Sequence, residues 1–413
     1  MRELFTGYSV ADYRRRGRDF SRGGAINGEA LVAFLLFLVA DAGKRGYALL
    51  LDAFRDQACS FGIGVGAAFN CSAAAWCDAR RKLDSAFVRG LVHRAADAYD
   101  ARYRPGRPRR FAVDGSKLNL RRAPENQRTF GVPEGAHCPQ VLISTLYDLD
   151  TLVPHDVVVA PYATSEREEL VRLLDRVRPG DTLVLDRGYP SFELLRMLTD
   201  AGIRFVMRVP TTHSFAAIQP FLRGPSDDAL VAIDPPQGHA LTTDGPVDVR
   251  MIRSTVPGHG PLVLLASPAA PGETADEIVA LYRRRWEIEE YYKIAKSDYF
   301  GQGQLHAKSA EGVRQEIYAQ ALYVALSRYL MAAAATARDE EPTALSPKAA
   351  VLAVAEHLTR ILILDDHGSA AQRLIRLLER LRTPKQKRRR GRKFPRRSFK
   401  PSPKWGPAGR RGG

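Results

Sequence analysis

The stretch YRRRWEIEEYYKIAK at residues 282–296 joins an amphipathic helical pattern to a line of functional groups. An α-helix turns by about 100° per residue, so the side chains of Tyr282, Arg285, Glu289 and Lys296 fall within an arc of about 60°. The neighbouring stripe is apolar enough to dock the helix on a core, and comprises Leu281, Ile288, Tyr292 and Ala295. A carboxylate among cations on a packed helix suits a site for metal ions and phosphate. Alone, the pattern is more simply a solvated charged face with ion pairs between successive turns.

Two further segments are short apolar runs that end in aspartate. The first, FAVDGS at residues 111–116, places Asp114 after the run, and the second, TLVLDRGY at residues 182–189, places Asp186 there. Taken singly, each aspartate is most simply a turn former at the end of a strand. If both strands belong to one sheet, however, the fold can bring the two carboxylates side by side.

The spacing Tyr-x2-Arg-x3-Glu-x6-Lys, with two such aspartates before it, resembles the signature of bacterial insertion-sequence transposases of the DDE type. Within these, the group typified by insertion sequence four is the most similar. The segment EGVRQEI at residues 311–317 also resembles the helix that follows the last catalytic residue in this family. The resemblance extends over residues 70–330, and it implies a ribonuclease-H-like catalytic domain that carries out DNA transposition, a form of DNA recombination.

The resemblance implies that Asp114, Asp186 and Glu289 are both the catalytic residues and the metal ligands. They would hold two Mg²⁺ ions per active site, or Mn²⁺ in their place. Asp114 would bridge both ions, while Asp186 would hold one and Glu289 the other. Two divalent ions can activate the nucleophile and hold the leaving oxygen of a phosphodiester, and Mg²⁺ prefers hard oxygen ligands.

Contacts with DNA follow partly from the same resemblance. Arg285 and Lys296 would contact phosphates of the transposon end, with Tyr282 packed beside them. Lys117 and Arg187 are further candidates on the ground of charge alone.

A second DNA-binding region is indicated nearer the amino terminus. Two short helices around a turn, with the basic cluster Arg80, Arg81 and Lys82 on the first, fit a small DNA-binding module. The same cluster also fits a solvated basic end of a helix, so the sequence leaves both interpretations open.

Charge is concentrated at the carboxyl end. The chain of 413 residues has 62 Lys and Arg against 46 Asp and Glu, a net charge of +16. Residues 382–413 hold 14 basic residues and no acidic one, so the remainder has 48 against 46, a net charge of +2. This tail has too few apolar residues to fold alone, and such tails bind polyanions without reading sequence. A solubilising tail and an anionic membrane surface are weaker alternatives.

The pattern of elements predicts an α/β (α+β) fold, in which a ribonuclease-H-like mixed sheet is flanked by helices. Strands are expected at 111–114, 141–149, 152–162, 182–185, 205–209 and 262–267, and the helix of the opening stretch is expected over 273–299. The expected order is a helical N-terminal DNA-binding domain at 1–105, the core at 106–210, a β-rich insertion at 211–260, the second part of the core at 261–337, C-terminal helices at 338–381 and a disordered basic tail at 382–413.

Several classes of protein are disfavoured. The four cysteines, Cys59, Cys71, Cys77 and Cys138, lack the spacing of a zinc site. The most apolar run, residues 30–40, is too short to span a bilayer and suits a buried helix. We therefore expect no membrane partner, and a location in the bacterial cytoplasm with the nucleoid.

The predicted function is that of a DNA transposase, which binds the ends of its insertion sequence, cleaves the DNA and transfers 3′ ends to target DNA. Its partner would be double-stranded DNA, both transposon ends and target, and the family implies a homodimer on two ends. Two alternatives stay open: a ribonuclease-H-like nuclease without strand transfer, and a DNA-binding protein that has lost catalysis.

Some relatives stack a tryptophan of the β insertion on a flipped base. This insertion has no tryptophan, and Phe215 or Phe221 could substitute.

Overall fold

The computed structural model describes most of the chain from residue 6 to residue 381. The described residues are 6–20, 25–41, 46–59, 70–212, 215–236, 245–255, 261–268, 272–296, 305–336, 339–342, 345, 350, 354 and 375–381. The predicted basic tail therefore lies outside the described residues, as does most of the predicted C-terminal helical region. Residues 375–381 of that region are helical, as expected.

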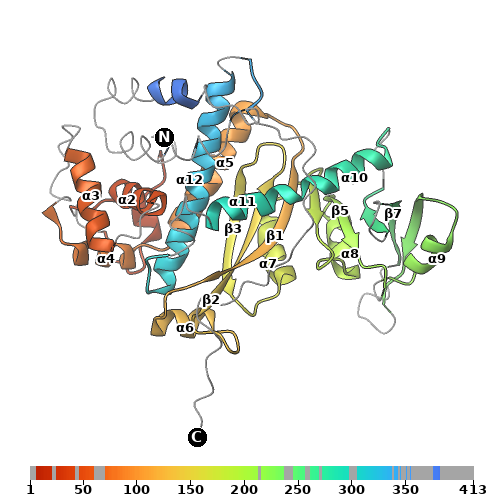
Figure 1. The fold of residues 1–413 in the computed structure, drawn as a ribbon, viewed down its shortest axis with the longest axis horizontal. Coiled ribbons are helices and arrows are strands. Elements are labelled where there is room, and N and C mark those ends of the chain that lie inside the picture. Colours follow the sequence, from red (N-terminus) through yellow and green to blue (C-terminus); the bar gives the residue numbers. More distant parts are fainter. Residues whose placement is uncertain are drawn as a thin grey trace, which may run out of the picture.

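The amino-terminal part is helical, in agreement with the sequence analysis (Figure 1). Its elements are the 3-10 helix η1 (Val10–Tyr13), α2 (Gly28–Ala40), α3 (Tyr47–Cys59), α4 (Ala73–Lys82) and α5 (Ala86–Tyr103). Ser72 caps α4, because its side chain accepts a hydrogen bond from the Ala75 amide. The apolar run predicted to be a buried helix is α2, whose residues are almost all buried. No helix in the described part of the chain combines the length and the apolar character needed to cross a bilayer.

One mixed sheet of eight strands forms the centre of the molecule (Figure 1). The strands are β1 (Arg110–Asn119), β2 (Gln140–Asp148), β3 (Pro154–Pro161), β4 (Thr182–Leu185), β5 (Arg204–Val209), β6 (Asp228–Ile233), β7 (Val247–Ser254) and β8 (Leu262–Ala266). Their order is β3-β2-β1-β4-β5-β8-β7-β6. The central strands β1, β4 and β5 run parallel, and all other neighbours are antiparallel. The predicted β-rich insertion supplies β6 and β7, which continue the same sheet at its edge.

Helices cover both faces of this sheet. Those that follow β1 are α6 (Pro124–Phe130), α7 (Glu166–Leu173) with η3 (Leu174–Arg176), α8 (Phe192–Asp200), α9 (Ile218–Arg223), α10 (Ala275–Arg284), α11 (Trp286–Lys296) and α12 (Ala310–Thr336). Successive side chains of a strand point to opposite faces. Accordingly, Ala112 of β1 packs in a core with α5, α10, α11 and α12, whereas Phe111 and Val113 pack in a second core with α7, α8 and α9. Phe221, one of the candidates for stacking on a base, is buried in the second core.

The long helix α12 joins the amino-terminal helices to the sheet, because it packs against α2, α5 and β3 (Figure 1). A buried ion pair holds this junction: Arg80 Nη2 of α4 lies 3.0 Å from Glu316 Oε1 of α12. Arg80 also donates to Gln315 Oε1 and to the carbonyl oxygen of Gly312. The Arg80 side chain is therefore committed inside the protein, and it offers almost no surface to DNA. The next two cations, Arg81 and Lys82, are exposed.

We expect Glu316→Gln to lower the free energy of unfolding by about 3–5 kcal/mol, because it leaves the buried Arg80 guanidinium without its counter-charge. Urea unfolding followed by circular dichroism measures the effect. Arg81→Gln is the matched control: its ion pair with Asp78 is exposed and should contribute less than about 1 kcal/mol. Equal losses in the two variants would mean that the buried pair does not hold the junction.

Candidate functional site

The two predicted aspartates lie side by side where the parallel pairing of β1 with β4 ends. β1 and β4 are parallel neighbours, and Val113 pairs with Leu185, so Asp114 and Asp186 follow paired positions. By alternation along each strand, both aspartates are on the face of Ala112 and Val184, which is the face covered by α10, α11 and α12. The prediction that a sheet places these carboxylates side by side is thus consistent with the strand register.

The predicted helix of the opening stretch covers the same face, but it has two segments. α10 ends at Arg284 and α11 begins at Trp286, with Arg285 as the residue between them. Arg285 keeps helical angles (φ −49°, ψ −30°), so the line of Tyr282, Arg285 and Glu289 on one face is retained. The backbone of Lys296 is in α11, whereas its side chain lies outside the described residues.

A buried tyrosine fixes α11 on the sheet next to Asp114. The Tyr292 hydroxyl donates to the Asp114 carbonyl oxygen at 2.8 Å, and it lies 3.0 Å from Thr145 Oγ1 of the neighbouring strand β2. The sequence analysis gave Tyr292 only an apolar docking role, which its burial confirms. Nothing in the sequence pattern predicted the hydrogen bond to the strand that carries the first aspartate.

Arg285 lies between two of the three carboxylates. Its Nη2 atom is 2.9 Å from Glu289 Oε1, and its Nη1 atom is 3.7 Å from Asp114 Oδ2. The third carboxylate, that of Asp186, contacts Tyr282 of the same helical line. The Tyr282 hydroxyl donates to Asp186 Oδ1 at 3.4 Å. The structure therefore connects Asp114, Asp186 and Glu289 through Arg285 and Tyr282.

The electrostatics of the site are dominated by burial of negative charge. Burial raises the pKa of Asp114 to about 6, the Arg285 guanidinium opposes this rise, and the nearby carboxylate of Glu166 adds to it. Burial also raises the pKa of Tyr282, with a further contribution from Asp186. Tyr189, buried just after Asp186, has its pKa raised by burial and by the charges of Glu166, Asp114 and Asp186. Neither Tyr189 nor Glu166 was among the site residues predicted from the sequence.

The other residues predicted to contact DNA lie outside the line of Tyr282, Arg285 and Glu289. Arg187 is exposed directly beside Asp186. Lys117, three residues after Asp114 on β1, is exposed, and its Nζ atom lies 5.7 Å from the centre of the Tyr162 ring. Both cations are therefore near the edge that holds the aspartates. Arg81 and Lys82 lie instead on α4, in the amino-terminal helices.

Carboxylate oxygens are the donors that Mg²⁺ and Mn²⁺ prefer, so Asp114, Asp186 and Glu289 have the right chemistry to hold these ions. In the described part of the chain, however, three potential ligand atoms lie within 4.8 Å of one another only at Asp100, Asp148 and His155. The carboxylates of the predicted site are thus not drawn into a compact cluster, and a guanidinium lies between two of them.

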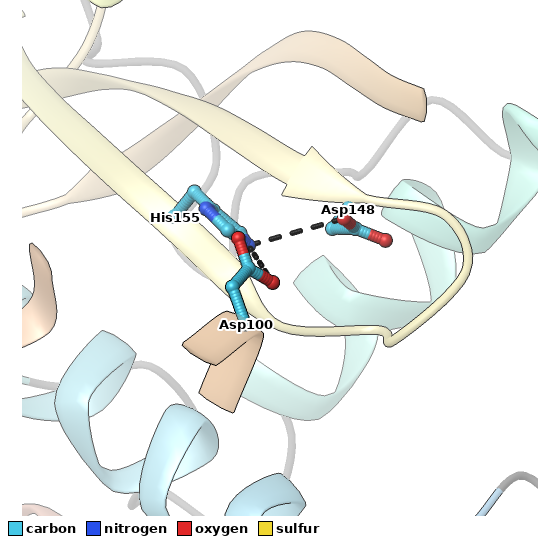
Figure 2. Close-up of side chains that lie close together, drawn as sticks. All are labelled: Asp100, Asp148 and His155. Atoms are coloured by element: carbon cyan, nitrogen blue, oxygen red, sulfur yellow. Dashed lines mark ion pairs between the residues drawn. The ribbon is translucent and has the colours of Figure 1, made fainter. Parts of the chain in front are cut away.

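The Asp100, Asp148 and His155 cluster occupies the opposite end of the strands (Figure 2). Asp148 pairs with Phe111, which is three residues, or about 10 Å, before Asp114 along β1. His155 Nε2 lies 3.9 Å from a carboxylate oxygen of each aspartate, and burial lowers its pKa well below 6.5.

This cluster has the donors to hold a metal ion, but two cations already neutralise it. Arg104 Nη1 lies 2.7 Å from Asp148 Oδ2, and Arg109 Nη1 lies 3.7 Å from Asp100 Oδ2. Its clearest role is to join α5 to the β2–β3 turn through charge pairs.

Comparisons with known proteins identify the family and a similar fold. A family model described as "Transposase DDE domain" matches residues 105–326. No curated protein matches the chain. Among solved structures, the chain is similar to a piggyBac transposase in a cryo-EM synaptic complex with hairpin DNA. The TM-score is 0.51 at 12% sequence identity, over 91% of this chain and 82% of that chain. The predicted fold class, a ribonuclease-H-like mixed sheet flanked by helices with a helical amino-terminal part, is confirmed.

The buried Asp100 predicts a specific dependence of stability on pH. Burial, followed by the charge of Asp148, raises the pKa of Asp100 from 3.8 to about 6. The folded protein therefore holds this proton more tightly than the unfolded chain does. The resulting stabilisation is complete below pH 3.8 and is lost as the pH rises to 6.

We expect urea unfolding between pH 4 and 7 to show this loss when wild type is compared with Asp100→Asn. Stability relative to the variant should fall by about 1–2 kcal/mol, allowing for solvent screening of a partly exposed carboxyl. A difference between wild type and variant that stays constant with pH would contradict the assignment.

Proposed function

Because the chain belongs to the family of transposases with a DDE domain, we propose that it binds the ends of its own insertion sequence, cleaves the DNA there and joins the 3′ ends to target DNA. The observation that carries this proposal is the pairing of β1 with β4, which brings Asp114 and Asp186 to neighbouring positions. Glu289 of the covering helix α11 is linked to Asp114 through Arg285. We place the chain in the group of insertion sequence four, on the spacing of its Tyr-Arg-Glu-Lys residues, and expect it to act on bacterial nucleoid DNA.

Asp114, Asp186 and Glu289 would together hold two divalent ions, Mg²⁺ or Mn²⁺. Such ions activate the attacking oxygen of a phosphodiester reaction and stabilise the leaving oxygen. The family resemblance assigns Asp114 a contribution to both ions. The net negative charge of three carboxylates is the feature that attracts these ions.

Arg285 would change partners during this process. Without DNA its guanidinium neutralises Asp114 and Glu289. If divalent cations replaced it at these carboxylates, the guanidinium would be free to bind a phosphate, which it recognises well as a planar donor. Tyr282 would support this movement from its place beside Asp186, and Lys296 would contact a neighbouring phosphate.

Binding of the duplex would involve the amino-terminal helices as well. A groove of about 720 Å³ is lined by residues 15–20, which follow η1, by α4, by α6 and by the start of α12. Its cationic lining residues are Arg15, Arg16, Arg18, Arg81 and Lys82. The acidic residues Asp19, Asp78, Glu125 and Glu311 share this lining, so the groove is mixed in charge. Exposed cations of this kind contact phosphates without reading sequence. A homodimer would hold two transposon ends together.

We expect purified protein to nick a DNA end in Mg²⁺, and Asp114→Asn, Asp186→Asn and Glu289→Gln each to reduce the rate at least about 100-fold. Each change removes a negative ligand oxygen and keeps the size of the side chain. Glu290→Gln is the matched control, because Glu290 is exposed on the same helix and pairs with Lys293. Gel-shift affinity for DNA should change little in any variant.

Two outcomes would overturn parts of this proposal. Metal-dependent nicking that survives all three substitutions would show that the site is elsewhere. A second assay supplies a pre-cut 3′ end and target DNA: cleavage without joining would identify a nuclease rather than a transposase.

A separate prediction concerns residues 382–413, which hold 14 basic residues. Ending the chain after Leu381 should weaken non-specific DNA binding and flatten its dependence on salt, because each lost phosphate contact removes about 0.9 from the slope of log K against log salt concentration. Fluorescence anisotropy at several salt concentrations measures the slope. An unchanged slope would refute the role of the tail in DNA binding.

A further inference from the structure

A fourth carboxylate, Glu166, lies next to the proposed catalytic edge. Glu166 is the first residue of α7, directly after the helix cap Ser165 and after the end of β3. It comes from the face of the sheet opposite to α11, and it reaches the strand that carries Asp114 at the adjacent residue, Gly115. No sequence pattern singles out Glu166, because an acidic residue in the first turn of a helix is ordinary.

Gly115 provides the space for this approach. A Cβ atom built on Gly115 would lie 2.5 Å from Glu166 Cδ and 2.6 Å from Oε1, distances that real Cβ atoms do not show. The carboxyl group of Glu166 thus packs directly on the β1 backbone beside Asp114. Any residue other than glycine at 115 would have to displace the carboxyl group.

The start of α7 is also fastened to the loop that carries Asp186. The guanidinium of Arg167 donates to the carbonyl oxygen of Gly188 at 2.7 Å and to that of Pro190 at 3.2 Å. In the same loop, the buried Tyr189 directs its hydroxyl to Glu166 Oε2 at 3.4 Å. These contacts hold Glu166 beside β1, which carries Asp114, and next to the loop that carries Asp186.

Counter-charges are unevenly distributed around the site in the part of the chain that the structure describes. Among the residues that the structure describes, no cation lies within ion-pair distance of Glu166, whereas Arg285 serves Asp114 and Glu289. Arg285 therefore offsets part of the charge of Asp114 but not that of Glu166. A cation bound beside Glu166 and Asp114 would relieve the repulsion between these carboxylates that Arg285 leaves.

We propose that Glu166 is a further ligand of the metal site, holding a divalent cation together with Asp114, either directly or through water bound to the metal. This inference rests on the proposed function. It assigns to the chain four acidic side chains, from β1, α7, β4 and α11, rather than three. The cation would be of the oxygen-preferring class, Mg²⁺ or Mn²⁺.

A purely structural role for Glu166 can be separated from this one. A negative charge in the first turn stabilises a helix by interaction with its dipole, and Glu168 provides the same charge in the same turn. Glu168 is exposed and does not contact Gly115. Glu168→Gln is therefore the matched control for Glu166→Gln.

The first experiment measures binding of Mn²⁺ directly, by electron paramagnetic resonance and calorimetry, on the full chain with and without duplex DNA. We expect Glu166→Gln to weaken the binding of one ion about 10- to 100-fold, the range typical of supporting groups at metal sites. Glu168→Gln should bind as wild type does, and neither variant should melt below wild type without metal. Unchanged Mn²⁺ affinity in Glu166→Gln would overturn the inference.

The second experiment measures the Mg²⁺ concentration that gives half-maximal nicking. Glu166→Gln should require more Mg²⁺ and should be partly restored by raising it. If Asp114→Asn abolishes nicking and Glu166→Gln leaves the Mg²⁺ requirement unchanged, this inference fails and the proposed function stands. If wild type binds no Mn²⁺ in either form and does not nick DNA, both fail.

Discussion

The repulsion between the carboxylates of the proposed site is the constraint on which that site depends. Asp114 of β1, Asp186 after β4 and Glu289 of α11 lie under the same helices, but their charges oppose one another and they do not form a compact cluster. Without metal, Arg285 offsets part of this repulsion by lying between Asp114 and Glu289. Burial nevertheless raises the pKa of Asp114 to about 6. A site with excess negative charge is suited to divalent cations, which would neutralise it more fully than one guanidinium does.

The backbone provides the force that holds these charges in place. β1 and β4 pair in parallel at the centre of the sheet, and apolar side chains on both faces of each strand are buried. The helix that brings Glu289 is anchored by Ile288 and Tyr292, which are buried, and by the hydrogen bond from Tyr292 to the Asp114 carbonyl oxygen. Hydrophobic burial of the two cores therefore supplies the free energy that keeps the carboxylates close.

Adjacent charges of the same kind have different roles in this protein. Arg80 and Arg81 are neighbours on α4, yet Arg80 is buried in a pair with Glu316 and Arg81 is exposed. Among acidic groups, Asp148 is neutralised by Arg104, whereas Glu166 packs on Gly115 and has no ion pair with a described cation. The identity of a charged residue thus says little about its role until its neighbours across the fold are known.

The sequence by itself determined the type and approximate bounds of most described elements, the order of the acidic residues and the line of Tyr282, Arg285 and Glu289. These depend on periodicity, caps and spacing along one segment. Only the tertiary structure decided that Arg80 is internal, that Arg285 separates two carboxylates, and that Glu166 and Tyr189 border the site. Such facts depend on contacts between segments distant in the chain, and local patterns do not record which segments pack together.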